Sequence, residues 1–298
     1  YECVGNSDGI PVVFLHGGPG SGCSETSKTF FDPKKWFAVF FDQRGCGLSK
    51  PAGETEENNT QLLLNDIEDL RLKLKIQRWV VFGGSWGSTL AIMYAISYPK
   101  NVSALVLRGI FFASSREIDW FLFELRRFMP REWNSFTADI DFEENDSSSI
   151  INYYYDQVFS PNREEAVKYA KKWRNWEEAA MRLTYTQRDK KEVPNTNPGE
   201  NNRILASMKV HLHYLKNKCF LEPGELLKNL SCLNEMPTYI VQGQIDTICP
   251  PETSELLYMK LPNSFITRVH GAGHGAYETA IKEALLVALE NVEKEIKK

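Results

Sequence analysis

Short apolar runs separated by helix-like segments occupy the first third of this 298-residue chain. The runs lie at residues 12–15, 36–41, 79–82 and 104–107. Leucine and isoleucine recur at helical spacing between the second and third runs, which predicts a helix over residues 60–76 with Thr60 as its N-cap. Continuous apolar strands are typical of a parallel sheet that is buried on both faces. The pattern therefore predicts an α/β fold, with a mostly parallel sheet and helices on both faces.

The same alternation returns near the C-terminus, with a strand at 237–241, a helix at 251–260, a strand at 264–269 and a terminal helix. Residues 112–235 differ, because they are rich in aromatic residues, charges and helix formers and contain few strand signals. We predict an α/β core from residues 1–111 and 236–298, with residues 112–235 inserted as a helical cap over the carboxyl edge of the sheet. A loop is expected within the cap at residues 193–199.

The overall composition excludes several classes of protein. The chain has 35 Lys and Arg against 39 Asp and Glu, a net charge of −4, and no basic stripe, so we expect no nucleic-acid partner. No apolar run approaches the roughly 20 residues that span a bilayer, so we expect no membrane partner. The six cysteines have no metal-binding spacing and no signal peptide begins the chain, which predicts free thiols and a cytoplasmic location. The composition leaves monomer and homo-oligomer equally open.

One motif carries most of the functional information. The run GGSWG at residues 83–87 fits G-x-S-x-G, with an apolar strand before it and a helix-like segment after it. This is the nucleophile elbow of the α/β-hydrolase fold, a sharp turn that raises a serine hydroxyl above the edge of the sheet. Small residues flank the serine because strand and helix pass close together. The motif predicts an α/β-hydrolase fold with Ser85 as the nucleophile.

A serine hydroxyl needs a base and an acid that orients the base, and in this fold they follow the serine in the order acid, then histidine. His274 lies in a glycine-rich turn after the last strand and is the expected base, with His270 as the competitor. Asp246 follows the strand at 237–241 and is the expected acid; the alternative interpretation is an N-cap of the next helix. Asp42 is the other candidate acid, but it precedes the serine.

The oxyanion formed during acyl transfer needs backbone N–H donors. We expect one donor from Trp86, the residue after the nucleophile, and one from Gly18 in the run HGGPG at residues 16–20. The alternative interpretation of HGGPG is a plain tight turn. Because these residues supply the whole chemistry of acyl transfer, we expect no metal and no organic cofactor.

Several motifs together are similar to one family. HGGPG (16–20), DQRGCGLS (42–49) and GGSWGSTLA (83–91) resemble the prolyl aminopeptidases, or proline iminopeptidases, of the α/β-hydrolase superfamily. The resemblance runs from Tyr1 to the terminal helix, and we expect the family's first strand to precede Tyr1. It implies a serine exopeptidase that releases N-terminal proline from short peptides with a free N-terminus, through an acyl-enzyme on Ser85.

The resemblance also implies substrate-binding residues. Glu177 matches the family's W-x-x-W-E carboxylate, which holds the substrate's amino group, and Phe111 and Phe121 match aromatic positions around the proline ring. His211 stands where the family has a second glutamate, and Leu215 replaces an aromatic residue. From the residues alone, Glu177 would be interpreted as a solvated carboxylate.

The sequence bears on three alternative functions. His211 and Leu215 favour a broader serine esterase or amidase on the same fold, while the complete catalytic set disfavours a non-catalytic binding protein. Dehalogenases and epoxide hydrolases need an aspartate where Ser85 stands. A further cap carboxylate, such as Glu178 or Glu124, could assist Glu177.

Overall fold

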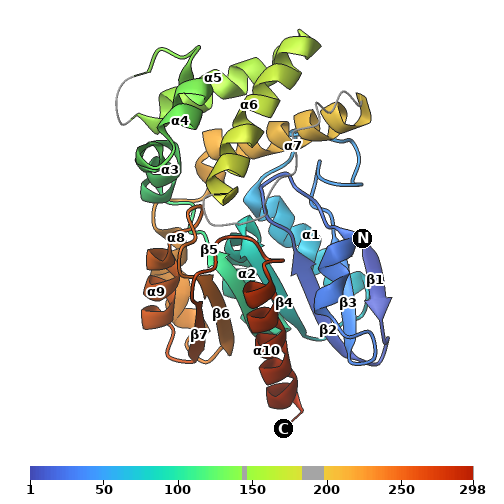
Figure 1. Ribbon diagram of the computed structural model, residues 1–298. Coiled ribbons are helices and arrows are strands. Elements are labelled where there is room, and N and C mark those ends of the chain that lie inside the picture. The colour runs from blue at the N-terminus through green and yellow to red at the C-terminus, as the bar shows by residue number, and fades with distance from the viewer. Residues whose placement is uncertain (143–145, 183–197, 298) are drawn as a thin grey trace.

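The computed structural model describes residues 1–142, 146–182 and 198–297, and a seven-stranded sheet lies at its centre (Figure 1). The strand order is β1-β3-β2-β4-β5-β6-β7, and all neighbours are parallel except β1, which is antiparallel to β3. The strands are β1 (Glu2–Gly5), β2 (Ile10–Leu15), β3 (Trp36–Phe41), β4 (Trp79–Ser85), β5 (Val102–Ile110), β6 (Thr238–Gly243) and β7 (Ser264–Val269). The predicted mostly parallel sheet is confirmed.

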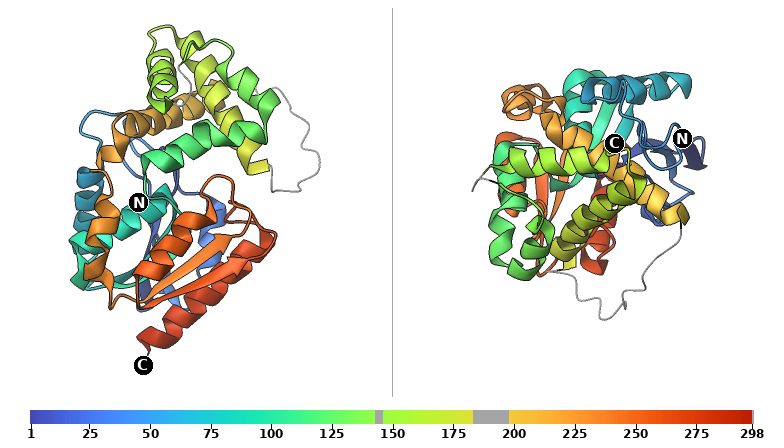
Figure 2. Two further views of the ribbon diagram at one scale, coloured as in Figure 1. Left: turned by 90° about the vertical axis from the view of Figure 1, so that its left-hand side faces the viewer. Right: turned by 90° about the horizontal axis from the view of Figure 1, so that it is seen from above.

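Helices cover both faces of this sheet because neighbouring strand residues point to opposite sides. Val13 of β2 packs in one apolar cluster, and its neighbour Val12 packs in the other. Helices α1 (Thr60–Lys73), α2 (Trp86–Ser97) and α9 (Pro251–Lys260) bury leucines in the first cluster. Helix α10 (Thr279–Ile296) and the 3-10 turn η1 (Glu25–Phe30) cover the other face, as Figure 2 shows for α10.

The start of α1 corrects one sequence prediction. The N-cap is Asn59, not Thr60: the Asn59 backbone is extended, and its side chain accepts a hydrogen bond from Leu62 N at 2.9 Å. Thr60 is already helical, and its hydroxyl donates instead to the carbonyl of Cys219. An asparagine in extended conformation can reach the free N–H groups of the first turn, whereas the Thr60 hydroxyl is used in a tertiary contact.

A group of helices lies over the carboxyl edge of the sheet (Figure 1). They are α3 (Ser115–Leu122), α4 (Pro130–Thr137), α5 (Ser147–Val158), α6 (Arg163–Arg182) and α7 (Pro198–Lys216), with the 3-10 turn η3 (Glu124–Arg127). These helices share a separate aromatic cluster, in which the Phe136 ring stacks on Tyr154 at 4.7 Å between ring centroids. Of the predicted loop at 193–199, residues 193–197 lie outside the described residues, and α7 begins at Pro198.

Helix α7 joins this upper cluster to the core below. Its Leu212 packs among the upper aromatics, whereas Tyr214 packs in the core cluster with its ring centroid 5.0 Å from that of Trp86. The following elements, η4 (Lys218–Phe220), α8 (Glu225–Asn229) and η5 (Leu230–Leu233), pack with the core, as does the region around η2 (Pro99–Asn101). None of the described helices combines the length and apolar character that crossing a bilayer requires.

Candidate active site

Ser85 ends β4 at the carboxyl edge of the sheet and immediately precedes α2. Its backbone is strained, with φ at 57° and ψ at −127°, a conformation that costs a side-chain-bearing residue about 1–3 kcal/mol. A Cβ atom on Gly83 would lie 2.1 Å from the carbonyl oxygen of Gly87, so strand and helix approach too closely for any side chain there. The turn is therefore built as a nucleophile elbow.

Asp246 and His274 meet beside the elbow. The His274 Nδ1–H donates to Asp246 Oδ2 at 2.8 Å, and both side chains are buried. The second carboxylate oxygen, Oδ1, accepts hydrogen bonds from the backbone N–H groups of Ile248 and Cys249 at 2.9 and 2.8 Å, which fixes the carboxylate. Since α9 begins only at Pro251, Asp246 is not its N-cap.

The competing residues lie elsewhere. His270 is exposed at the end of β7. The Asp42 carboxylate accepts the backbone N–H groups of Cys23 and Leu48 at 2.6 and 2.8 Å, and so it organises the loops that follow β2 and β3. The structure thus brings together the acid and base that the chain order predicts.

Arg108 is a half-buried cation behind these residues that the sequence analysis missed. Its Nη1 donates to the His274 carbonyl, and a Cβ atom on Gly84 would lie 2.7 Å from its Nη2. Burial lowers the pKa of Arg108, while the nearby carboxylate of Asp246 opposes that shift. One guanidinium therefore contacts both the elbow strand and the histidine loop. The sequence held one sign of this role, because Arg108 is the single charged residue of the strand at 102–110.

The glycine loop after β2 lies against the nucleophile. A Cβ atom on Gly17 would lie 3.4 Å from Ser85 Cβ, and Gly18 has a φ of 116°, which favours glycine. Trp86 is the first residue of α2, so its N–H has no acceptor inside the helix. Its side chain is buried in the core.

A buried hydrogen-bond network ties this loop to the elbow, and the sequence analysis did not find it. Gln43 donates its backbone N–H to His16 Nε2 at 3.1 Å and its side-chain Nε2–H to the His16 carbonyl at 3.0 Å. Its Oε1 accepts from Trp86 Nε1 at 2.9 Å. Burial lowers the pKa of His16, so the ring is neutral, and Nδ1–H donates to the Gly17 carbonyl at 2.8 Å. Gln43 therefore sets the distance between the two expected oxyanion donors.

Replacing Gln43 with leucine is expected to lower kcat about 10- to 100-fold with little change in KM, because a small misplacement of oxyanion donors weakens only the transition state. Steady-state hydrolysis of a prolyl amide measures both constants. Leu48→Ala is the control, since Leu48 is an exposed residue of the same loop. A Gln43→Leu enzyme with wild-type kcat would contradict this role for the network.

A cavity of about 280 Å³ opens between the elbow and the upper helices. It is lined by Ser85, His274 and Gly18 of the core and by Glu177 of α6 and His211 of α7. Its apolar wall is made by Phe111, Ile118, Phe121, Leu215 and Ile248. The predicted binding residues thus line a single cavity with the predicted nucleophile and the predicted base.

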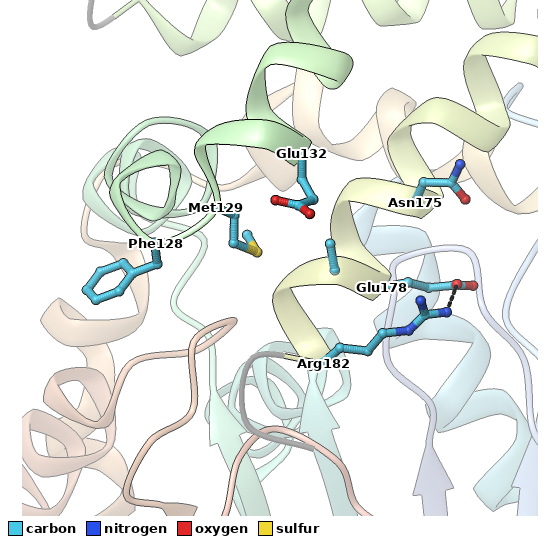
Figure 3. Close-up of a pocket in the computed structure, with 7 residues that line it drawn as sticks. Phe128, Met129, Glu132, Asn175, Glu178 and Arg182 are labelled. Atoms are coloured by element: carbon cyan, nitrogen blue, oxygen red, sulfur yellow. Dashed lines mark hydrogen bonds and ion pairs between the residues drawn. The ribbon is translucent and has the colours of Figure 1, made fainter. Parts of the chain in front are cut away.

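Two adjacent glutamates of α6 have different surroundings. Glu177 lines the cavity, where its Oε1 accepts from Trp173 Nε1 at 3.2 Å. Glu178 lines a separate surface pocket with Phe128, Met129 and Asn175, and it pairs with Arg182 at 3.2 Å (Figure 3). Of the open alternatives for a second carboxylate, Glu178 therefore lies outside the cavity. Glu124 is also outside it and pairs with Arg127 at 3.1 Å.

Comparison with known proteins decides the family. The family of the alpha/beta hydrolase fold matches residues 10–280. The proline iminopeptidase of Arabidopsis thaliana is 40% identical over 296 residues, which cover 98% of this chain and 76% of that protein. That of Neisseria meningitidis serogroup A is 38% identical over 296 residues, covering 98% and 91%. This chain belongs to the proline iminopeptidase family. The solved proline iminopeptidase of Mycobacterium smegmatis shares its fold, with a TM-score of 0.65 at 18% identity over 98% of this chain and 93% of that one.

This member of the proline iminopeptidase family has a second carboxylate on the cavity wall, Glu117. It caps α3 by accepting from Ser114 N at 2.9 Å, and it also accepts from Phe112 N at 3.0 Å and Thr253 Oγ1 at 3.2 Å. The sequence analysis missed it, although the spacing of Ser114 and Glu117 is that of a capping box. Glu117 thereby fixes the start of the upper helices relative to the core.

Cys249 also lines the cavity of this proline iminopeptidase family member. Burial raises the pKa of its thiol well above the ordinary value, and the nearby carboxylate of Asp246 adds to the shift. The side chain is therefore a neutral thiol. The thiolate, and not the thiol, is the form that reacts as a nucleophile. Ser85 is the better nucleophile candidate in this cavity.

Proposed function

We propose that this chain is a serine exopeptidase that releases N-terminal proline from short peptides through an acyl-enzyme on Ser85. The observation that carries the proposal is the shared cavity. Glu177, a carboxylate suited to a substrate ammonium, faces the same 280 Å³ space as Ser85 and the His274–Asp246 pair. The relatives from Arabidopsis thaliana and Neisseria meningitidis, which are 40% and 38% identical to this chain, are named proline iminopeptidases.

The proposed reaction follows from the roles of the groups. His274 Nε2 takes the hydroxyl proton as Ser85 Oγ attacks the prolyl carbonyl carbon, and the N–H groups of Gly18 and Trp86 stabilise the oxyanion. Collapse of the tetrahedral intermediate breaks the C–N bond, and His274 gives its proton to the leaving amine. Water then attacks the acyl-enzyme by the same route, which frees proline and restores Ser85. Asp246 orients the imidazole and stabilises its charged form.

Recognition of the free N-terminus rests on charge. An ammonium held in a small cavity needs a counter-charge beside it, and Glu177, half-buried on the cavity wall, supplies one. An acylated N-terminus carries no positive charge, so it would leave Glu177 without a partner. Phe111 and Phe121 offer apolar surface for the pyrrolidine ring. The proposed partner is therefore a short peptide with a free N-terminal proline.

We propose that residues 1–111 and 236–298 form the core and that residues 112–235 form the cap, of which η4, α8 and η5 pack against the core. The core supplies the reacting groups and the cap supplies Glu177 and His211. The free state of all six cysteines supports the proposed cytoplasmic location, since a reducing compartment keeps thiols free.

A peptide digest tests the proposal. The protein is incubated with Pro-Gly-Gly, Gly-Pro-Gly and N-acetyl-Pro-Gly-Gly, and free proline is measured by mass spectrometry. Release of proline from Pro-Gly-Gly alone supports the exopeptidase. Equal cleavage of the acetylated peptide, or cleavage of none of them, would contradict it.

Glu177→Gln is expected to lower kcat/KM for a free-amine prolyl amide about 10- to 100-fold, chiefly by raising KM, because a charge-assisted hydrogen bond is lost. Hydrolysis of a short nitrophenyl ester, which has no ammonium, should be unchanged. The matched control is Glu178→Gln, since Glu178 lines the other pocket. Equal effects of the two substitutions on the prolyl amide would contradict the assignment.

A broader serine esterase or amidase is the second candidate. The observation in its favour is His211, which lies 3.4 Å from Glu177 where the resemblance calls for another carboxylate. A site with less negative charge holds an ammonium less firmly. This candidate predicts fast hydrolysis of short nitrophenyl esters with no release of proline from Pro-Gly-Gly.

A further inference from the structure

Phe111 lies between the end of β5 and the start of α3. It directly follows Ile110, the last residue of β5, so its own N–H and C=O groups lie beyond the strand ladder. Its side chain forms part of the apolar wall of the cavity that Ser85 also lines. Backbone polar groups beside an apolar core need partners, and these partners decide how the ring is placed in the wall.

Two hydroxyls of α2 supply the partners. Ser88 Oγ accepts the Phe111 N–H at 3.1 Å, and Thr89 Oγ1 donates to the Phe111 carbonyl at 2.6 Å. Both hydroxyl side chains are fully buried. Hydroxyls inside a helix commonly bond to a carbonyl three or four positions earlier, as Ser88 does by donating to Ser85 O at 2.6 Å. Thr89 instead bonds to a residue 22 positions ahead, so its hydroxyl serves a tertiary contact.

The two peptide groups on either side of the Phe111 Cα atom are therefore fixed. The preceding peptide is held through its N–H by Ser88. The following peptide is held through its carbonyl by Thr89 and through its N–H by Glu117, at 3.0 Å. Because Ser88 is also bonded to the carbonyl of Ser85, a short chain of hydrogen bonds connects the backbone of the elbow to the backbone that carries the Phe111 ring.

We propose that Thr89 is a positioning residue through which the site selects acyl groups that contain a five-membered ring. Its hydroxyl keeps the Phe111 ring in a fixed position relative to Ser85. A pyrrolidine ring that packs against Phe111 then has its carbonyl carbon within reach of the Ser85 hydroxyl, whereas an acyl group without a ring gains little from this wall. The identity of the ring rests on the proposed function. Because Thr89 is fully buried, it acts on a substrate only through Phe111.

Two esters separate ring selection from the reaction itself. The nitrophenyl ester of cyclopentanecarboxylic acid carries a carbocyclic analogue of the prolyl group without its amine, and nitrophenyl acetate has no ring. In each case Ser85 Oγ attacks the ester carbonyl and nitrophenolate leaves, and water then hydrolyses the acyl-enzyme. Ser85→Ala gives the blank. Each variant is compared with wild type on the same ester, so the different intrinsic reactivities of the two esters do not enter the result.

Thr89→Val nearly keeps the shape of the side chain and removes the hydrogen-bond donor. It should lower kcat/KM for the ring ester about 5-fold or more and leave the acetate ester within about twofold, because a small displacement of one binding group affects the substrate that contacts it. Thr89→Ser restores the hydroxyl and should return the ring ester to within about twofold of wild type.

Thr60→Val is the matched control. It also removes a buried threonine hydroxyl that donates to a carbonyl, that of Cys219, and Thr60 does not line the cavity. Thr60→Val should therefore leave both esters within about twofold of wild type, although the loss of a buried hydrogen bond destabilises the two valine variants by similar amounts. Melting temperatures of the two variants verify that they are matched.

A double substitution tests whether Thr89 acts through Phe111. Phe111→Ala removes the ring that Thr89 positions. In the Phe111→Ala protein, a further Thr89→Val should lower kcat/KM for the ring ester by less than about twofold, since the wall is already lost. A loss of the same size in the presence and in the absence of the Phe111 ring would overturn the inference.

Three other results would also overturn it: equal kcat/KM of Thr89→Val and wild type on the ring ester, an equal loss on both esters, or no hydrolysis of the ring ester by wild type above the blank. If Thr89→Val does not fold, Thr89→Ala removes the same donor without an added methyl group and takes its place in every comparison. The two proposals fail separately. Release of proline from Pro-Gly-Gly with no effect of Thr89→Val on the ring ester would refute only this inference, whereas the expected ester results without release of proline would refute only the proposed function.

Discussion

Ser85→Ala is expected to lower kcat for prolyl amides about a million-fold, because no other group can form the acyl-enzyme. Loss of one hydroxyl leaves the elbow glycines and the core contacts of α2 in place, so the fold should be retained. Initial rates with a fluorogenic prolyl amide measure the effect, and an unchanged melting temperature confirms the fold. Residual activity within about 100-fold of wild type would instead implicate another nucleophile, with Cys249 on the same cavity wall as the first suspect.

Asp246→Asn is expected to lower kcat about 10 000-fold. The amide keeps an oxygen for the N–H groups of Ile248 and Cys249, so the turn should hold. It can also donate to His274 Nδ1, which favours the wrong tautomer, and it removes the negative charge that stabilises the imidazolium. Steady-state kcat on a prolyl amide measures the loss.

The matched comparison for this prediction uses the two histidines. His270→Ala should leave kcat within about twofold, because His270 is exposed, whereas His274→Ala should lower kcat at least as much as Asp246→Asn does. Equal effects of the two histidine substitutions would contradict the assignment of the base.

The fold was predictable where apolar pattern and element coincide. The strand at 36–41, the helix at 251–260 and the strand at 264–269 are observed with the predicted bounds, since each is a clear apolar or amphipathic segment between turn residues. Strand β1 was not predicted, because it is a short edge strand with exposed residues and no alternation. The predicted N-cap of α1 was wrong by one residue. Asn59 and Thr60 are both good capping residues, and only tertiary contacts choose between them.

Part of the candidate site was also predictable from the sequence, and part was not. Chain order predicts which acid and which histidine lie near Ser85, because parallel strands end at one edge of the sheet. The supporting residues could not be predicted this way. Gln43 meets Trp86 across 43 positions of sequence, and Arg108 meets His274 across 166, so no local pattern connects either pair. The roles assigned to the site residues stay predictions until the substitutions are measured.

We expect Ser85 to hydrolyse substrates that are selected by their free prolyl ammonium. Hydrolysis of proline-7-amido-4-methylcoumarin, measured beside its N-acetylated form with Ser85→Ala as the blank, tests this most directly. We expect rapid cleavage of the free amine and loss of nearly all activity on the acetylated compound, since only the free amine carries the positive charge that pairs with Glu177. Similar rates on the two compounds, or ester hydrolysis with no cleavage of the prolyl amide, would contradict it.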